Sequence, residues 1–220
     1  MTHIPVQAHA HFAEAAAGRR DFAAIARWVS PGAKVLDLGC GDGSLLGYLR
    51  DAVGARGYGV EKDDANVLAC VKNGIDVLQM NLEEGLAGFE AQSFDVVILS
   101  QTLQAVQNTE GIVLEMLRVG REVIVTFPNF GYWRHRIQLI NGHMPVSKNL
   151  PYQWYDTPNV HLCTISDFDR FCVEHRIPVR ERLVMTEGKA VTLLPNWLGL
   201  LAMYRLGQHE GTLQAGQRAP

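Results

Sequence analysis

Short apolar runs alternate with segments of helical periodicity along the first part of the chain. The runs have the length and composition of buried strands, and they fall at residues 34–38, 56–60, 75–80, 94–100 and 122–127. Helical spacing of apolar residues occupies the intervals 44–51, 63–72 and 109–118, and a further helix is predicted over 22–29. The run 96–99 is apolar at every position, which indicates a strand buried on both faces. This alternation predicts an α/β fold with a doubly wound, mostly parallel sheet.

The remainder of the chain is less regular. Residues 128–164 have little periodicity and many prolines, asparagines and aromatic residues, so they are interpreted as an insertion after the fifth strand. Beyond it, the pattern predicts a helix near 166–175, strands near 179–185 and 190–194, and an apolar end segment over 197–206. We expect a single domain over residues 20–206, with a flexible N-terminal arm over 1–19 and a disordered tail over 207–220.

Residues 35–44 are the most informative stretch, because an apolar strand there runs directly into a loop with a glycine at every second position. Such glycines let the backbone approach a flat ligand with no Cβ in the way. Ser44, which follows the loop, is expected to cap the next helix. A dinucleotide fingerprint needs a glycine where Ser44 stands, and Asp42 places a carboxylate where a pyrophosphate would bind. The loop therefore suits a neutral or cationic nucleoside.

A second acid stands at the end of the next predicted strand. Glu61 lies where a carboxylate can accept hydrogen bonds from both hydroxyls of a ribose. Together with the glycine loop, this acid favours a sulfonium nucleoside as the ligand. The alternative is a strand-to-helix turn in an α/β domain that has lost its ligand.

The motif from Asp37 to Gly43, followed by Glu61, resembles the class I S-adenosylmethionine-dependent methyltransferase fold. The resemblance implies S-adenosylmethionine or S-adenosylhomocysteine as the cofactor, with Glu61 as its ribose-binding acid. It also implies that Asn81 faces the adenine amino group and that Leu82 offers its backbone N–H to the ring, although Asn81 as a simple cap is the alternative. The cofactor-binding residues expected in this way are Asp37, Gly39, Cys40, Gly41, Gly43, Glu61, Asn81, Leu82, Ser100 and Gln101.

Three further segments narrow the resemblance. Residues 36–46, 99–104 and, above all, 127–159 are similar to the MetW family of methionine-biosynthesis proteins. That resemblance implies a methyltransferase-like protein that supports a homoserine O-acyltransferase, MetX, by forming a complex with it. The rival hypothesis is an independent small-molecule methyltransferase that uses residues 128–164 as a substrate lid.

The insertion itself should discriminate between these hypotheses. A lid should enclose a cavity with convergent polar groups, whereas a docking surface should be flat and aromatic. Residues 132–136 and 152–155 are rich in tyrosine, tryptophan and arginine, which dominate the energetics of protein interfaces. These segments favour a partner surface.

Composition excludes several other classes. A formal net charge of −3 provides no general attraction to nucleic acid or to anionic lipid. The chain has no apolar run long enough to span a membrane and no signal-peptide pattern at its start, so a cytoplasmic location is expected. Its four cysteines form no C-x-x-C pair, which is typical of a reduced protein.

Metal binding and general-base catalysis find little support in the residue pattern. His161, Cys163, Cys172 and His175 have poor spacing for zinc, so no metal is predicted. The fourth predicted strand ends without an acid or a histidine, and candidate proton-transfer groups near the insertion are limited to His135, Asp156 and His161. Methyl transfer from a sulfonium can proceed largely by alignment, so the catalytic residues and the methyl acceptor stay undefined.

Overall fold

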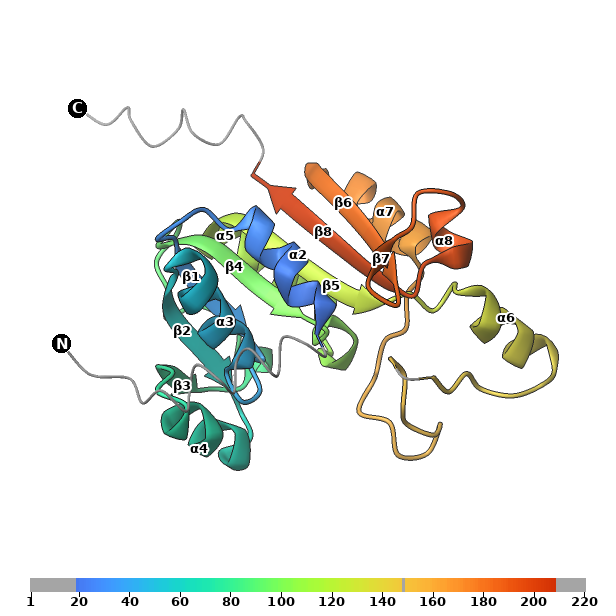
Figure 1. Ribbon diagram of the computed structural model, residues 1–220, viewed down its shortest axis with the longest axis horizontal. Coiled ribbons are helices and arrows are strands. Elements are labelled where there is room, and N and C mark those ends of the chain that lie inside the picture. The colour runs from blue at the N-terminus through green and yellow to red at the C-terminus, as the bar shows by residue number, and fades with distance from the viewer. Residues whose placement is uncertain (1–18, 148, 209–220) are drawn as a thin grey trace.

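A computed structural model of the protein describes residues 19–147 and 149–208. Its sheet has the strand order β3-β2-β1-β4-β5-β8-β6-β7 (Figure 1). The first five strands pair in parallel, while β8, β6 and β7 extend the sheet in antiparallel pairing. The strands are β1 (Lys34–Leu38), β2 (Arg56–Glu61), β3 (Val77–Gln79), β4 (Phe94–Ser100), β5 (Gly120–Pro128), β6 (Val179–Thr186), β7 (Lys189–Ala190) and β8 (Leu201–Gly207).

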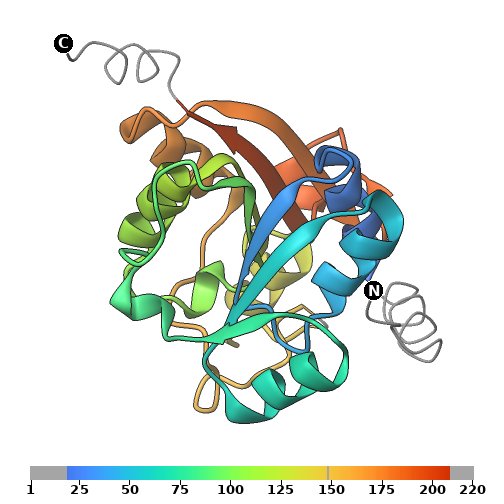
Figure 2. The same ribbon diagram turned by 90° about the vertical axis from the view of Figure 1, so that its left-hand side faces the viewer.

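Helices cover both faces of this sheet. Figure 2 shows α2 (Arg20–Trp28) and α3 (Ser44–Val53) on one side and α5 (Thr109–Val119) and α7 (Ile165–Glu174) on the other. Val96 and Ile98 of β4 pack in the same cluster as α2 and α3, whereas Val97 and Leu99 pack in the cluster of α5 and α7. The doubly wound, mostly parallel sheet predicted from the sequence is therefore confirmed. The α-helices are α2 (Arg20–Trp28), α3 (Ser44–Val53), α4 (Asp64–Lys72), α5 (Thr109–Val119), α6 (Trp133–Ile140), α7 (Ile165–Glu174) and α8 (Pro195–Leu198), and the 3-10 helices are η1 (Leu82–Glu84) and η2 (Leu103–Ala105).

The C-terminal part of the sheet differs from the sequence prediction. The prediction of a strand over 190–194 is wrong, because β7 ends at Ala190 and the side chains of Leu193 and Leu194 are 71% and 62% exposed. The apolar end segment instead contains α8 and then β8, which lies between β5 and β6. Leu194, the N-cap of α8, has a left-handed backbone conformation with a φ of 45°, and Pro195 opens the helix, so the end of the predicted segment is not extended.

The insertion leaves the sheet at the carboxyl end of β5. It contains α6 and then a loop that runs past the sheet before α7 begins (Figure 1). The predicted N-terminal arm and C-terminal tail lie outside the described residues except for Arg19, Gly207 and Gln208. Gly207 closes β8, and the side chain of Gln208 donates to the carbonyl oxygens of Leu117 and Gly120.

Candidate cofactor site

The strand order changes direction between β1 and β4, and a crevice forms at such a switch point outside the carboxyl ends of the strands. A hollow of about 370 Å³ lies at this point. Half of the predicted cofactor-binding residues line it, namely Asp37, Gly39, Cys40, Gly41 and Ser100. The fold therefore gathers residues from the ends of both strands around one open space.

All three glycines of the loop between β1 and α3 have positive φ, with values of 67° at Gly39, 56° at Gly41 and 78° at Gly43. A Cβ at Gly39 would lie 2.7 Å from the side chain of Thr102, and one at Gly43 would lie 2.9 Å from Ile75. Gly39 and Gly43 are thus required for packing as well as for backbone conformation. Gly41 differs, because a Cβ there would have no heavy atom within 4 Å. A ligand can therefore approach the loop from the Cβ side of Gly41.

Glu61, the last residue of β2, forms a hydrogen bond with the glycine loop. Glu61 is buried, and its Oε2 accepts a hydrogen bond from the backbone N–H of Gly41 at 2.9 Å. Its Oε1 accepts from the N–H groups of Lys62 and Asp63, at 2.8 and 3.0 Å. A carboxylate has about four acceptor positions, so these bonds leave room for one more donor. Glu61 therefore shapes the glycine loop in addition to any contact with a ribose, which the sequence pattern did not reveal.

Asp42 and Ser44 form the start of α3 in a way that corrects a sequence expectation. Gly43 is the N-cap, Ser44 is the first helical residue, and the Oδ1 of Asp42 accepts a hydrogen bond from the N–H of Ser44 at 3.0 Å. The capping role expected for Ser44 is wrong, because Gly43 occupies the N-cap position and Ser44 already lies inside the helix. The same carboxylate occupies the anion-binding position of the helix, as expected for a loop that does not bind a pyrophosphate.

Asp37 supplies a carboxylate on the wall of the hollow. It is 2% exposed, and burial raises its pKa to about 7, while nearby Arg19 lowers and Glu61 raises that pKa. A cation in the hollow would favour the ionised carboxylate. The Asp37 carboxylate is consequently suited to a positive group of a ligand rather than to an anion.

A polar network at the start of α2 borders the hollow, and sequence reasoning missed it. Arg19 forms an ion pair with buried Asp21 at 2.7 Å and reaches toward the hydroxyl of Ser100 at 3.5 Å. The amide of Gln101 donates to the same carboxylate of Asp21 at 3.1 Å. Arg19, Phe22, Asp42 and Leu45 line the hollow without having been predicted. Nothing local marks Arg19 in the sequence, because it meets β4 only through tertiary packing.

The hollow is not lined by the remaining predicted residues, which are Gly43, Glu61, Asn81, Leu82 and Gln101. Asn81 is exposed, and its Oδ1 accepts from the N–H of Glu83 at 3.2 Å, so the side chain caps η1. Leu82 is half-buried against the core cluster of α5 and α7. Gln101 has a φ of 55° and faces a neighbouring, larger hollow. Contacts of Asn81 and Leu82 with adenine stay predictions.

The larger hollow, of about 980 Å³, adjoins the first, and Arg19 lines both. Gln101, the start of α2, the turn between β6 and β7, and the insertion form its walls. From the insertion it receives Tyr132, Arg134, Gln138, Val146, Ser147, Asn149 and Pro151.

Two features were searched for across the described parts of the chain. Within 19–147 and 149–208, no group of three or more His, Cys, Asp or Glu side chains is arranged to hold a metal ion. Over those same ranges, none of the helices combines the length and apolar character that a membrane crossing requires.

Comparison with solved structures defines the class of fold. A S-adenosylmethionine-dependent methyltransferase from Mesorhizobium loti matches with a TM-score of 0.64 at 14% identity, over 86% of this chain and 98% of that one. The magnesium protoporphyrin IX methyltransferase ChlM from Synechocystis PCC 6803, solved with bound S-adenosylhomocysteine, matches with a TM-score of 0.59 at 19% identity, over 87% and 84%. The protein thus has the fold of the class I S-adenosylmethionine-dependent methyltransferases.

Sequence comparison identifies the family within this class. The family model of the methionine biosynthesis protein MetW matches residues 19–206, and the chain belongs to that family. It is 41% identical over 157 residues to the bifunctional methionine biosynthesis protein MetXA/MetW of Rhodopirellula baltica, a match that covers 67% of this chain and 25% of that protein. It is also 35% identical over 113 residues to the ubiquinone/menaquinone biosynthesis C-methyltransferase UbiE of Xanthomonas campestris, over 47% of this chain and 44% of that one. The chain therefore spans about a quarter of the first of these relatives and less than half of the second.

Proposed function

We propose that the protein binds S-adenosylmethionine or S-adenosylhomocysteine in the hollow between β1 and β4. The observation that carries this proposal is the buried carboxylate of Asp37 beside a glycine loop whose central residue, Gly41, has positive φ and open space on its Cβ side. The combination provides an attraction for a cation and a surface that a flat nucleoside can approach closely. The bound structure of ChlM supports the ligand class at the level of the fold.

The residues around the hollow suggest how each part of the cofactor is held. Asp37 pairs with the cationic amino-acid end, and the guanidinium of Arg19 binds its carboxylate, since arginine presents paired donors to such groups. Glu61 keeps Gly41 in place and accepts one ribose hydroxyl with its remaining acceptor position. Residues 81–82 flank the adenine, and residues 100–101 flank the methionine chain.

Calorimetry with S-adenosylmethionine and S-adenosylhomocysteine tests the proposal. Glu61→Ala removes a charge-assisted hydrogen bond to the ribose and releases Gly41, so we expect affinity to fall by about ten- to hundredfold. Glu84→Ala, which removes an exposed acid at the end of η1, is the matched control and should bind like the wild type. A wild-type protein that binds neither compound at millimolar concentration would refute the cofactor assignment.

We further propose that the protein acts in the cytoplasm in methionine biosynthesis and supports a homoserine O-acyltransferase, MetX, by complex formation. The fused MetXA/MetW protein of Rhodopirellula baltica supports this pairing, because it joins both names in one polypeptide. The insertion offers a surface for such a partner: Trp154 and Tyr155 are 72% and 71% exposed and pack edge to face at 5.6 Å. Exposed aromatic pairs of this kind are typical anchors of protein interfaces. We assign no nucleic acid, membrane or metal as a partner.

Co-expression with the cognate acyltransferase tests this second part. We expect co-elution on size exclusion and higher acyl-transfer activity than the acyltransferase has alone. Trp154→Ala should weaken association by more than about 1 kcal/mol, or about fivefold or more in Kd. The matched control is Val173→Ala, which truncates a side chain that is 77% exposed on α7, away from the insertion. Trp133 is half-buried beside Tyr132 and is the weaker candidate for an anchor.

An independent methyltransferase is the second candidate, and the hollow of about 980 Å³ favours it. The insertion lines that hollow with polar side chains, Arg134 and Gln138 among them, next to Gln101. A substrate lid would have this property. Failure to co-elute at micromolar concentration, together with methyl transfer to a metabolite in a panel assay, would support this candidate over the accessory role.

A further inference from the structure

Residues 100–104 lie between the proposed cofactor hollow and the insertion. They contain the last residue of β4 and the start of η2. Ser100 lines the hollow, and a Cβ at Gly39 would lie 2.7 Å from the side chain of Thr102, so the segment also packs against the glycine loop. A ligand in the hollow would therefore meet one end of this segment.

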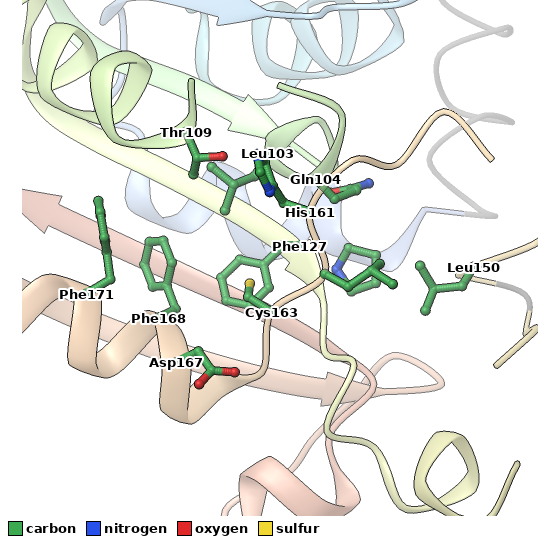
Figure 3. A pocket seen from close by; sticks show the side chains of 12 residues that line it. Leu103, Gln104, Thr109, Phe127, Leu150, His161, Cys163, Asp167, Phe168 and Phe171 are labelled. Carbon is green, nitrogen blue, oxygen red and sulfur yellow. The ribbon is translucent and has the colours of Figure 1, made fainter. Parts of the chain in front are cut away.

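The other end of the segment holds the insertion. The backbone oxygen of Gln104 accepts hydrogen bonds from the N–H groups of Val160 and His161, at 2.8 and 3.0 Å. Figure 3 shows Gln104 close to His161 at this junction. The Nε2 of His161 also lies 2.9 Å from the carbonyl oxygen of Gln107. The residues that follow the exposed aromatic pair of the insertion are thus bound to the chain that follows β4.

Two unfavourable features meet within residues 100–104. Gln101 has a φ of 55°, in the left-handed region that is costly for a residue with a side chain. The Oε1 of Gln104 is buried and has no hydrogen-bond partner among the described residues. The Nε2 of Gln104 donates to the carbonyl oxygen of Gln101 at 2.7 Å, so one hydrogen bond joins the strained residue to the unsatisfied amide. Features of this kind persist only where the surrounding contacts hold them, and they cluster in functional segments.

Gln101 is held in its conformation by two groups of contacts. Its backbone N–H donates to the carbonyl oxygen and the hydroxyl of Thr126, at 2.9 and 3.0 Å. Its side-chain Nε2 donates to Asp21 at 3.1 Å, and Asp21 forms the ion pair with Arg19, which lines the hollow. A cofactor bound to Arg19 would thus restrain the contacts that keep Gln101 in place.

We infer that Gln104 is a positioning residue that couples the cofactor site to the insertion through Gln101. Cofactor binding restrains residues 100–101, and the amide of Gln104 passes this restraint to residues 160–161, so that the end of the insertion opens less often. Because coupling between two sites is reciprocal, a partner that fixes the insertion raises cofactor affinity by the same factor. The inference rests on the proposed cofactor hollow and, for the second effect, on the proposed acyltransferase complex.

Hydrogen exchange tests the coupling in the protein alone. Saturating S-adenosylhomocysteine should slow the exchange of the Val160 and His161 amides about fivefold or more, the lower end of typical coupling between sites. The amide of Val191, which donates to Val184 at the far edge of the sheet, is the reference and should not change. Calorimetry reports cofactor binding itself. Binding without slower exchange at residues 160–161 would overturn the inference alone, whereas absence of binding would refute the cofactor assignment and the inference with it.

A pair of variants assigns the coupling to the amide of Gln104. Gln104→Met keeps the length of the side chain and removes the donor to Gln101. S-adenosylhomocysteine should still bind this variant within about fivefold of the wild-type affinity, but without slowing exchange at residues 160–161. Gln107→Met makes the same change at an exposed glutamine nearby and should behave like the wild type. Slower exchange that persists in Gln104→Met, with the fold intact by circular dichroism, would overturn the role of Gln104.

The reciprocal measurement uses the complex with the acyltransferase. S-adenosylhomocysteine should bind the wild-type protein about fivefold or more tightly in the complex than alone, and Gln104→Met should remove this difference. Equal affinity of the free and complexed wild-type protein would overturn the coupling. Failure to form the complex would count against the accessory role, and the exchange measurement would then decide the inference by itself.

Discussion

Two regions of the sheet are built on different principles. The cofactor half, residues 34–128, consists of five parallel strands: β1 joins β2 through α3, β2 joins β3 through α4, and β4 joins β5 through α5, while the connection from β3 returns to β4 beside β1. The C-terminal half, residues 129–208, combines a largely irregular insertion with antiparallel strands, and β8 lies between β5 and β6 out of sequence order. The first half contains the glycine loop of the proposed cofactor hollow, and the second half presents exposed aromatic side chains. The comparison shows that a regular half can form a hollow for a ligand at its strand ends, whereas the structure of the irregular half depends on a few buried polar contacts.

Asn129 is the main example of such a contact. It is fully buried, and its Nδ2 donates to the carbonyl oxygens of Asn196 and Gly199. Its Oδ1 accepts from the N–H groups of Gly131 and Ile165. One amide side chain thereby connects the start of the insertion, the start of α7 and both ends of α8.

His135 has a comparable role within the insertion. It is fully buried, and its Nε2 lies 3.1 Å from the hydroxyl of Ser147. Burial lowers the pKa of its imidazole, so the ring is held in its neutral form. The contact joins α6 to the irregular chain that follows it.

The largest effect is expected from a substitution that destabilises the C-terminal half and changes no residue of the cofactor half. Asn129→Leu leaves several buried backbone groups without a partner, at about 1–3 kcal/mol each, so we expect the free energy of unfolding to fall by at least about 3 kcal/mol. Urea unfolding would measure the loss. Asn141→Ala, at an exposed asparagine that ends α6, is the control and should change stability by less than about 0.5 kcal/mol. Equal stability of the two variants would contradict the role assigned to Asn129.

The next effect concerns only the cofactor half. Gly41→Val places a branched side chain in the open space of the hollow and should reduce the affinity for S-adenosylmethionine more than hundredfold, or by about 2.7 kcal/mol. Gly142→Val is a matched control, because Gly142 also has positive φ, at 81°, and no heavy atom within 4 Å of a Cβ. It carries the same backbone strain outside the hollow and should bind normally. Calorimetry together with circular dichroism separates lost binding from lost structure, and full affinity in Gly41→Val would refute the proposed loop contact.

The smallest expected effect is a dependence of ligand affinity on pH, which tests the role of the Asp37 carboxylate in the hollow. Asp37 has a pKa raised to about 7, so it is mostly protonated at pH 6 and mostly ionised at pH 8. A cationic ligand binds the ionised form, and its affinity should therefore rise about tenfold from pH 6 to pH 8. Asp37→Asn should remove this slope and bind weakly at both values. A slope that persists in Asp37→Asn would assign the titration to another group.

The same acid affects stability in the opposite sense. The folded state holds its proton up to about pH 7, whereas the ordinary pKa of an aspartate is 3.8. Between these values the native protein binds more protons than the unfolded chain, so the contribution of Asp37 to stability falls as the pH rises. A cofactor that pairs with the ionised carboxylate offsets this cost, which links ligand binding to the stability of the cofactor half.

The sequence by itself determined the class of fold and the position of the glycine loop. Strands buried on both faces, separated by helices of the right length, permit few arrangements other than a doubly wound sheet. The location of Gly39, Gly41 and Gly43 between a strand and a helix follows from the local pattern, because the loop that begins a crossover connection always follows the carboxyl end of a parallel strand. Glu61 was found for the same reason, at the end of the following strand.

Only the tertiary structure decided how distant segments meet. It placed Arg19 beside Ser100, 81 positions away in the sequence, and it made Glu61 a hydrogen-bond partner of the loop. It also placed β8 between β5 and β6, where the sequence had indicated only an apolar end segment. The periodicity of a segment reports which of its faces is buried, but not which segment covers that face. Contacts between distant residues depend on the packing of the whole sheet, so the local pattern could predict the loop and its acid but not Arg19 or the Asn129 contacts.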